Sequence, residues 1–221
     1  FVTIPLPHVN KYQCALLFID ISGFTALSVS LDVESLSKAI NSYFEMIVDL
    51  VISHHGDILK FAGDALFAEW RVVTQEDKDN SINGTATIDD CVLIAATCGA
   101  KVVAECSDYP VYSTTGLQIK SLNVHCGLGV GELTSVHVGN YHTRRELIVL
   151  GDPIDQVSKA EGAASLGEIV ASPEALSSLR KTCHLNNMST LTLEAPCMIA
   201  CRKQQYFVPK YDEEHISRLS K

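Results

Sequence analysis

The stretch Phe18–Thr25, FIDISGFT, constrains this chain more than any other. It completes an apolar run, CALLFID, that starts at Cys14 and ends in a carboxylate, Asp20. An uninterrupted apolar run of this length is typical of a strand buried on both faces of a sheet. Gly23 follows shortly after the carboxylate and permits an unusual backbone turn. The sequence therefore predicts a central strand that delivers one carboxylate to the end of a sheet, with a turn behind it.

Helical and strand-like patterns alternate after this strand. Apolar residues recur at three- and four-residue steps over 33–54 and 88–106, which predicts two long helices. Between them, the runs DILKFAG and DALFAEW meet at Gly63-Asp64, and so short a link predicts a hairpin. Residues 74–87 are polar and contain glycine, as a surface loop does.

Shorter elements are predicted in the second half of the chain. The runs LNVHCGLGVGEL and TSVHVGN, residues 122–140, predict a hairpin or strand pair, and residues 144–151 predict a further strand. A helix is expected from 152 to about 165, with Pro153 in its first turn, and Ser172-Pro173 opens another after a short strand. The order β-α-β-β-α-β predicts a ferredoxin-like α/β (α+β) core with antiparallel pairs and helices on one face.

We expect a single domain over residues 1–221. Its core is predicted to span about 14–172, with a C-terminal appendage of extra β and α pieces over about 173–221. Residues 1–13 are interpreted as a lead-in, and QYFVPK, residues 205–210, as a last strand candidate. The chain starts with phenylalanine rather than methionine, which indicates a piece of a longer protein.

Composition restricts the possible partners. The formal net charge is −9, from 17 basic and 26 acidic residues, which argues against nucleic-acid binding because that needs a basic face. An anionic ligand would need a metal or a local positive patch. The eight cysteines form no CxxC pair, so we expect a reducing, cytoplasmic setting. No apolar run reaches the roughly 18–20 residues of a membrane span.

Two carboxylates are expected to meet at one end of the sheet. Asp20 ends the first strand and Asp64 lies in the turn of the hairpin, and the flanking strands of a β-α-β-β unit are neighbours. Paired carboxylates repel unless a cation or proton intervenes, and hard oxygen ligands suit Mg²⁺. A two-metal site for attack at phosphorus is one interpretation. A solvated strand-end aspartate and a hairpin-turn aspartate are the alternative.

The turn after Asp20 admits a phosphate. The backbone amides from Ile21 to Thr25 lie at the predicted start of a helix, where the orphan N–H groups attract anions. The alternative is an ordinary N-capping serine or threonine with no ligand.

Beyond these separate patterns, the chain resembles a known family. FIDISGFT followed by GDILKFAGDALFAEW resembles the class III nucleotidyl cyclase catalytic domain, and within that family the first catalytic domain of the soluble, bicarbonate-responsive adenylyl cyclases. The resemblance runs from about Cys14 to Ser172. The runs CGLGVGELTSVHVGN and ELIVLGDPIDQVSKA are weaker continuations of it.

The resemblance implies conversion of ATP into 3′,5′-cyclic AMP and pyrophosphate. Asp20 and Asp64 would bind two Mg²⁺ ions, with Mn²⁺ as a substitute and the Ile21 carbonyl as a further ligand. The β- and γ-phosphates would be held by the backbone amides of four consecutive residues, Ser22, Gly23, Phe24 and Thr25. Active sites of this family form between two such domains, so a second cyclase domain, in cis or in trans, is an implied partner.

The positions that would serve a partner's site are mostly altered. The family pattern K-x-x-G-D carries a base-recognising lysine, which is Lys60 here. The position that reads the adenine edge is Ile148, which cannot hydrogen-bond a base, and the transition-state pair is replaced by Asp155 and Lys159. The chain is therefore predicted to supply the metal- and phosphate-binding half of a tandem enzyme.

A second, regulatory pocket is implied by the same resemblance. Lys60 and the Val149 backbone would face it, and in the soluble cyclases the matching pocket takes bicarbonate beside an arginine. That arginine position is Ser158 here, and the neighbouring Lys159 is a candidate substitute without the bidentate fork. A surface lysine with a buried stem is the alternative interpretation of Lys60.

Two further residues are candidate phosphate contacts. His125 occupies a position where the resembled domain has a phosphate-contacting lysine, and a plain strand histidine is the alternative. Arg145, paired in sequence with Arg144, has the reach to contact a polyphosphate, and a solvated loop arginine is the alternative.

Three functional hypotheses follow. The first is an adenylyl cyclase half-site. The second is a cyclase-like regulatory module that binds nucleotide or bicarbonate and activates a partner domain. The third is a guanylyl cyclase half-site, because base choice would lie in the partner.

Overall fold

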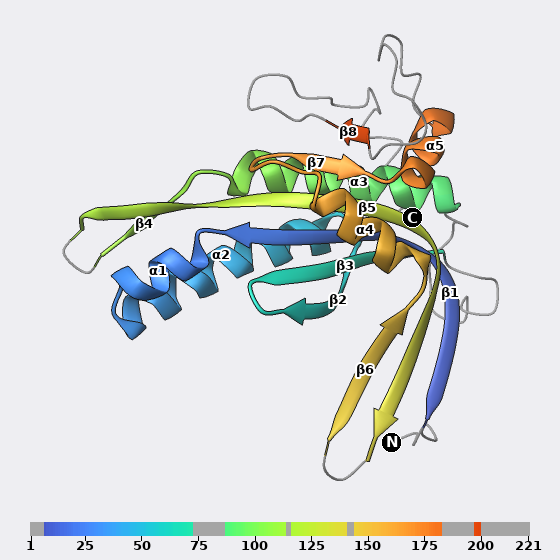
Figure 1. Cartoon of the computed structure of the whole chain (residues 1–221), viewed down its shortest axis with the longest axis horizontal. Coiled ribbons are helices and arrows are strands. Elements are labelled where there is room, and N and C mark those ends of the chain that lie inside the picture. Colours follow the sequence, from blue (N-terminus) through green and yellow to red (C-terminus); the bar gives the residue numbers. More distant parts are fainter. Residues whose placement is uncertain (1–6, 73–86, 114–115, 141–143, 183–196, 200–221) are drawn as a thin grey trace.

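A computed structural model describes residues 7–72, 87–113, 116–140, 144–182 and 197–199 of the chain (Figure 1). One mixed sheet contains the strands β1 (His8–Ser22), β2 (Asp57–Ala62), β3 (Ala65–Arg71), β4 (Tyr109–Tyr112), β5 (Gln118–Gly139), β6 (Arg145–Leu150), β7 (Ile169–Ala171) and β8 (Cys197–Ile199). The helices are α1 (Phe24–Ser30), α2 (Val33–Ser53), α3 (Ile88–Cys106), α4 (Asp152–Glu161) and α5 (Pro173–Thr182).

The sheet follows the predicted ferredoxin-like order. Its path is β2-β3-β1-β5-β7-β8, with β4 and β6 also pairing with β5. The predicted hairpin is confirmed, since β2 and β3 pair antiparallel across a turn in which Gly63 has φ +68°. The fold class is therefore as expected, and β4 is an element that the sequence patterns did not indicate. The strand candidate at 205–210 lies outside the described residues.

The central pair β1–β5 is much longer than predicted. Its antiparallel register runs without a shift from His8↔His137 to Ser22↔Asn123. The lead-in is thus a strand from His8 onward, and the predicted break between the two runs of residues 122–140 is wrong. Because β1 supplies partners along the whole of β5, the glycine-rich stretch needs no turn.

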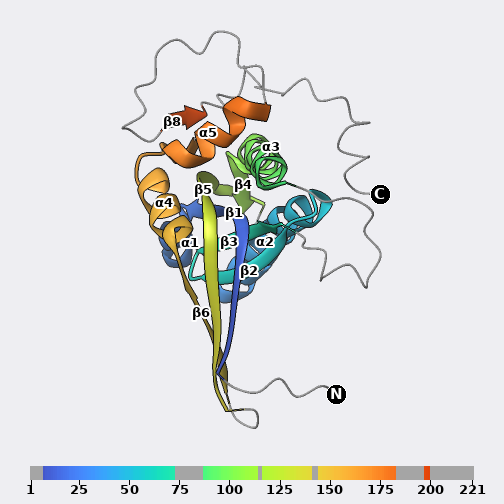
Figure 2. The same ribbon diagram turned by 90° about the vertical axis from the view of Figure 1, so that its right-hand side faces the viewer.

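The two faces of β1 belong to different layers. Ala15, Leu17 and Ile19 are completely buried in the main core with α2 and α3. The alternate residues Cys14 and Leu16 form a second cluster that α4 completes. Figure 2 shows α3 and α4 on opposite sides of β1 and β5. The expectation that the core helices lie on one face therefore holds, since these helices are α2 and α3, whereas α4, one of the extra elements after the core, packs on the opposite face.

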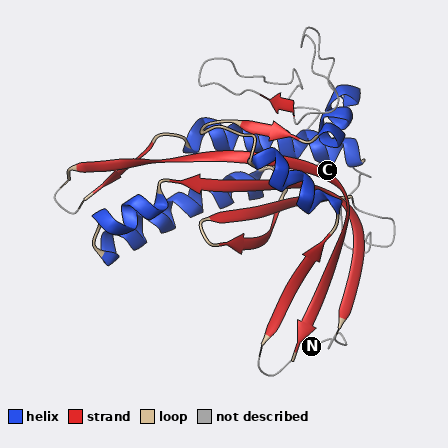
Figure 3. Cartoon of the chain, viewed as in Figure 1, coloured by secondary structure: helices blue, strands red, loops and turns tan. Residues whose placement is uncertain are grey.

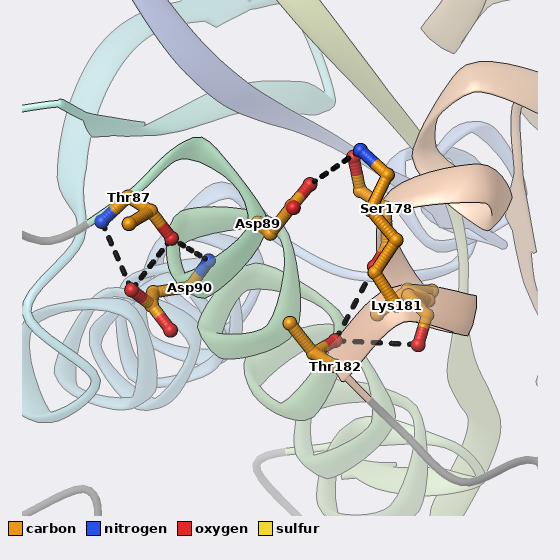
Figure 4. A network of polar contacts seen from close by, with 7 residues as sticks. Thr87, Asp89, Asp90, Ser178, Lys181 and Thr182 are labelled. Atoms are coloured by element: carbon orange, nitrogen blue, oxygen red, sulfur yellow. Dashed lines mark hydrogen bonds and ion pairs between the residues drawn. The ribbon is translucent and has the colours of Figure 1, made fainter.

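Side-chain caps mark where the two long helices, α2 and α3, begin. Asp32 caps α2 by accepting a hydrogen bond from the Ser35 amide at 2.9 Å. Thr87 and Asp90 form a reciprocal capping box at the start of α3 (Figure 4). In the same view, Lys181 of α5 reaches Asp89 of α3 at 3.4 Å, so a surface ion pair adds to the packing between these helices.

One end of the sheet extends away from the helices as a three-stranded arm (Figure 3). The arm consists of residues 8–13 of β1, residues 132–139 of β5, and β6. In β1 this segment is mostly exposed, in contrast to the buried run that starts at Cys14. The catalytic candidate Asp20 lies at the opposite end of β1.

Candidate active site

Asp20 lies between two neighbouring strands near the end of β1. It pairs with Ala65 of β3 on one side and with His125 of β5 on the other. Ala65 directly follows Asp64, so the structure places the two predicted carboxylates at adjacent strand ends. Burial raises the pKa of Asp20 above its ordinary value, the His125 charge lowers it, and the charges of Asp64 and Glu161 raise it further. Asp20 therefore sits in a carboxylate-rich site that favours a bound cation.

The predicted phosphate turn follows directly. Ser22 is the last residue of β1, Gly23 has φ +104°, and α1 begins at Phe24. A Cβ atom at position 23 would have a strained φ and would lie 3.2 Å from the Ser121 carbonyl oxygen. Only glycine suits this turn, as the sequence indicated. The role of the Ser22–Thr25 amides and of the Ile21 carbonyl stays a prediction.

His125 lies in the candidate site, where its imidazole contacts the side chains of neighbouring residues. Its Nε2 donates a hydrogen bond to Glu161 Oε1 at 2.8 Å and lies 3.5 Å from Asp20 Oδ2. Its Nδ1 lies 3.4 Å from Ser22 Oγ. The imidazole therefore links the end of β1, the phosphate turn and α4, whereas its contact with a phosphate stays a prediction.

Glu161 is the site residue that the sequence patterns missed. Glu161 is the last residue of α4, where the helix dipole disfavours a carboxylate. This unfavourable position was the one signal in the sequence that a cationic or hydrogen-bonding partner holds the Glu161 side chain. Glycines bring it close to β5. A Cβ at Gly127 would lie 2.4 Å from the Val157 carbonyl oxygen, and one at Gly129 would lie 3.0 Å from that of Pro153. The glycine-rich run of β5 thus serves the packing of α4.

The predicted regulatory residues lie on three elements. Lys60 is exposed on β2 and pairs with Phe67, Val149 lies on β6 at the margin of the second cluster, and Lys159 is exposed in the last turn of α4. A cleft of about 370 Å³ is lined by both β2 and β6. These three residues are not among its lining residues, so their joint pocket stays a prediction.

Arg145 lies far from Asp20 within one chain. It pairs with Gly139 in the arm, whereas Asp20 pairs with His125. At about 3.3 Å per residue, these two positions on β5 are roughly 45 Å apart along the strand. Arg145 lines the cleft instead, so a polyphosphate at Asp20 would not reach it in the same chain.

An ion pair between a buried carboxylate, Glu69, and a partly exposed guanidinium, Arg71, also lines the cleft. The Glu69 side chain is only 1% exposed and accepts hydrogen bonds from Tyr12 Oη at 2.9 Å and from Arg71 Nε at 2.7 Å. The Arg71 guanidinium stacks 4.1 Å from the Tyr12 ring centre. Burial, with the neighbouring Glu69 carboxylate, raises the pKa of Tyr12. This network joins β1 to β3.

The chain belongs to the family described as the adenylate and guanylate cyclase catalytic domain, whose profile matches residues 6–209. Adenylate cyclase type 10 of Rattus norvegicus is 35% identical over 175 residues, which cover 76% of this chain and 10% of that protein. The Homo sapiens protein of the same name is 29% identical over 179 residues, with the same coverage. The chain thus spans about a tenth of the length of these curated relatives.

Solved structures show the same fold. The adenylyl cyclase CyaB from P. aeruginosa has a TM-score of 0.63 at 22% identity, covering 86% of this chain and 93% of that one. The guanylyl cyclase Cya2 has a TM-score of 0.61 at 24% identity, and the match covers 86% of this chain and 90% of Cya2. These structures confirm the predicted fold, and the profile match together with the curated relatives confirms the predicted family. Within the described part of the chain, the structure contains no helix of the length and apolar character that a membrane crossing requires.

Proposed function

We propose that this chain is the metal- and phosphate-binding half of an adenylyl cyclase, converting ATP into 3′,5′-cyclic AMP and pyrophosphate. The observation that carries this proposal is the placement of Asp20 beside Ala65, so that Asp20 and Asp64 occupy adjacent strand ends in a chain of the cyclase family. The electrostatic effect of Asp64 on the pKa of Asp20 supports their proximity.

The donor atoms fit Mg²⁺. Asp20, Asp64 and the Ile21 carbonyl would hold two ions, because hard oxygen ligands suit Mg²⁺ and Mn²⁺ alike. When bound, the ions would lower the pKa of the ribose 3′-hydroxyl and neutralise the charge of the triphosphate. The amides of Ser22–Thr25 would hold the β- and γ-phosphates, with Gly23 shaping their turn.

A complementary domain completes the proposed enzyme. Ile148 has no hydrogen-bonding side chain for a base edge, and it is 45% exposed on β6. Base recognition would therefore come from a second cyclase domain, in cis or in trans. The adenylate cyclase relatives support ATP as the substrate, whereas the Cya2 fold shows that the same architecture occurs in a guanylyl cyclase.

We further propose that the chain is one domain of a longer cytoplasmic protein. Five of the cysteines that the structure describes, Cys14, Cys91, Cys98, Cys106 and Cys126, are free and buried, as in a reducing compartment.

A regulatory module is the second candidate function. Asp155 and Lys159 occupy the positions of the transition-state pair, which favours a domain that activates a partner without turnover of its own. Bicarbonate is the proposed ligand of a pocket that includes Lys60, Val149 and Lys159. Measuring activity against bicarbonate at fixed pH, with Lys60→Ala as the comparison, tests it; an intact enzyme that does not respond would remove bicarbonate from the account.

An assay of cyclic nucleotide formation distinguishes the cyclase half-site from the regulatory module. The chain is assayed alone and mixed with a complementary cyclase domain, with ATP or GTP and either Mg²⁺ or Mn²⁺. The half-site predicts product from ATP in the mixture only, and a loss of most of it with Asp20→Ala. A regulatory module instead predicts that the partner is activated and that Asp20→Ala leaves product formation unchanged.

A further inference from the structure

Three side chains from three elements converge at the proposed magnesium site, and one of them is itself a proposed magnesium ligand. They are Asp20 of β1, His125 of β5 and Glu161 of α4, and one ligand atom from each lies within 4.8 Å of the others. Two carboxylates and an imidazole are a different donor set from the carboxylate pair of Asp20 and Asp64. Imidazole nitrogen suits Zn²⁺ and neighbouring transition metals, whereas Mg²⁺ prefers oxygen alone.

We propose that Asp20, His125 and Glu161 form a binding site for Zn²⁺ or a similar transition-metal ion. Three protein ligands leave a fourth tetrahedral position for water or a phosphate oxygen. Because Asp20 belongs to both donor sets, an ion held here competes with Mg²⁺ for that carboxylate and inhibits the cyclase. This inhibition rests on the proposed function, but the binding itself does not.

The three ligands are held in place before any ion arrives. The close approach of α4 at Gly127 and Gly129 fixes the helix against β5. Gln156 reinforces it by accepting a hydrogen bond from the Val130 amide at 2.9 Å and donating one to the Val130 carbonyl at 3.0 Å. Glu161 therefore projects toward His125 from a rigid helix. A site built on packed strands and a helix loses little freedom when it binds an ion.

The outer contact of His125 also fits a metal ligand. A ligating histidine uses one ring nitrogen for the metal and donates the other N–H to a nearby acceptor. Here Nε2 faces both carboxylates, and Nδ1 lies 3.4 Å from Ser22 Oγ, which can accept that hydrogen bond. Zn²⁺ would replace the proton between Nε2 and Glu161, so the imidazole keeps its orientation and exchanges one tautomer for the other.

Charge and access agree with this assignment. Two ionised carboxylates balance a divalent ion, and a neutral imidazole adds no further charge. The side chains of Asp20, Glu161 and His125 are 27%, 25% and 12% exposed, so the site is partly desolvated but still open to solvent. The competing account is that a protonated His125 alone holds both carboxylates together and that no metal binds.

Zn²⁺ binding to the purified chain separates the two accounts. Titration calorimetry with Zn²⁺ alone, with no nucleotide, should give a site that His125→Asn and Glu161→Gln each weaken at least about tenfold. His137→Asn is the matched control, because His137 is another β5 histidine but lies in the arm. Co²⁺ absorption spectra should lack thiolate bands, which excludes the cysteines. Binding that both site variants retain, or that only His137→Asn removes, would overturn the proposal.

Measurements on the unmodified chain keep the test independent of variant folding. An anomalous difference map from Zn²⁺-soaked crystals should show a peak between Asp20, His125 and Glu161, and a peak only elsewhere, or none, would refute the site. In the reconstituted enzyme, excess Mg²⁺ should relieve inhibition by Zn²⁺, and inhibition unaffected by Mg²⁺ would refute the competition. If the reconstituted enzyme forms no product, the proposed function fails while the binding and crystal results still decide the metal site.

Discussion

Asp20 is held, partly buried, among Asp64, Glu161 and His125, and its pKa is raised above the ordinary value, mainly by burial. A carboxyl group whose pKa is higher in the folded than in the unfolded state lowers stability once it ionises. We therefore expect Asp20→Asn to raise the thermal unfolding midpoint in metal-free buffer at pH 7, with a gain that shrinks below about pH 4. The same variant should lose nucleotide turnover. A lower midpoint at pH 7 would show that the contacts of Asp20 outweigh its burial.

Arg71 is the counterion of a carboxylate that water barely reaches. Removing it with Arg71→Met leaves Glu69 charged and buried, and we expect a loss of about 3 kcal/mol in the free energy of unfolding. The low end of the usual range applies because Arg71 itself is 43% exposed. Urea denaturation measures the loss. The control Lys11→Met removes the exposed Lys11–Glu132 pair and should change stability by less than about 0.5 kcal/mol. Equal effects of the two variants would disprove the buried-pair account.

At the scale of elements, α2 depends on a cap that titrates. The amide and hydroxyl of Ser35 hold the pKa of Asp32 below its ordinary value. A depressed pKa means that the stabilisation is fully present above the pKa of the unfolded state and is lost as the pH falls through the lower pKa of the folded state. We expect unfolding midpoints in urea to decline below about pH 4 less steeply for Asp32→Asn, because asparagine caps without titrating. Superimposable pH profiles of the two proteins would contradict this.

The close packing of α4 against β5 depends on the absence of a side chain at Gly127. A methyl group there would press on the Val157 carbonyl oxygen and on the Glu161 amide, both of which are backbone atoms that cannot move aside. We predict that Gly127→Ala costs about 2 kcal/mol and displaces Glu161 from His125. Gly162→Ala is the control, since its nearest contact would be an ordinary 3.4 Å. Chemical denaturation compares the stability of the two variants. Unchanged stability of Gly127→Ala would show that α4 and β5 are not tightly packed at this position.

At the scale of the whole molecule, local patterns predicted most of the helices and strands but missed β4 and the beginning of β1. The first strand was recognised from its apolar run, but its start in the arm was missed because residues 8–13 are mostly exposed and show no such run. The glycines of β5 resembled a turn because their packing partner, α4, is distant in sequence. Asp20 and Asp64 were found from strand order, whereas Glu161 meets His125 across 36 positions that no periodicity connects.

The central claim is that this chain brings metal and phosphate binding to a shared cyclase site. Its most direct test is cyclic AMP formation from ATP by the chain mixed with a cyclase domain that carries the base-reading and transition-state residues. The account predicts product in the presence of Mg²⁺, with at least a hundredfold loss for Asp20→Asn and for Asp64→Asn, and a similar loss for the double variant because the pair acts as a unit. A mixture that forms cyclic AMP equally well with both aspartates replaced would contradict it.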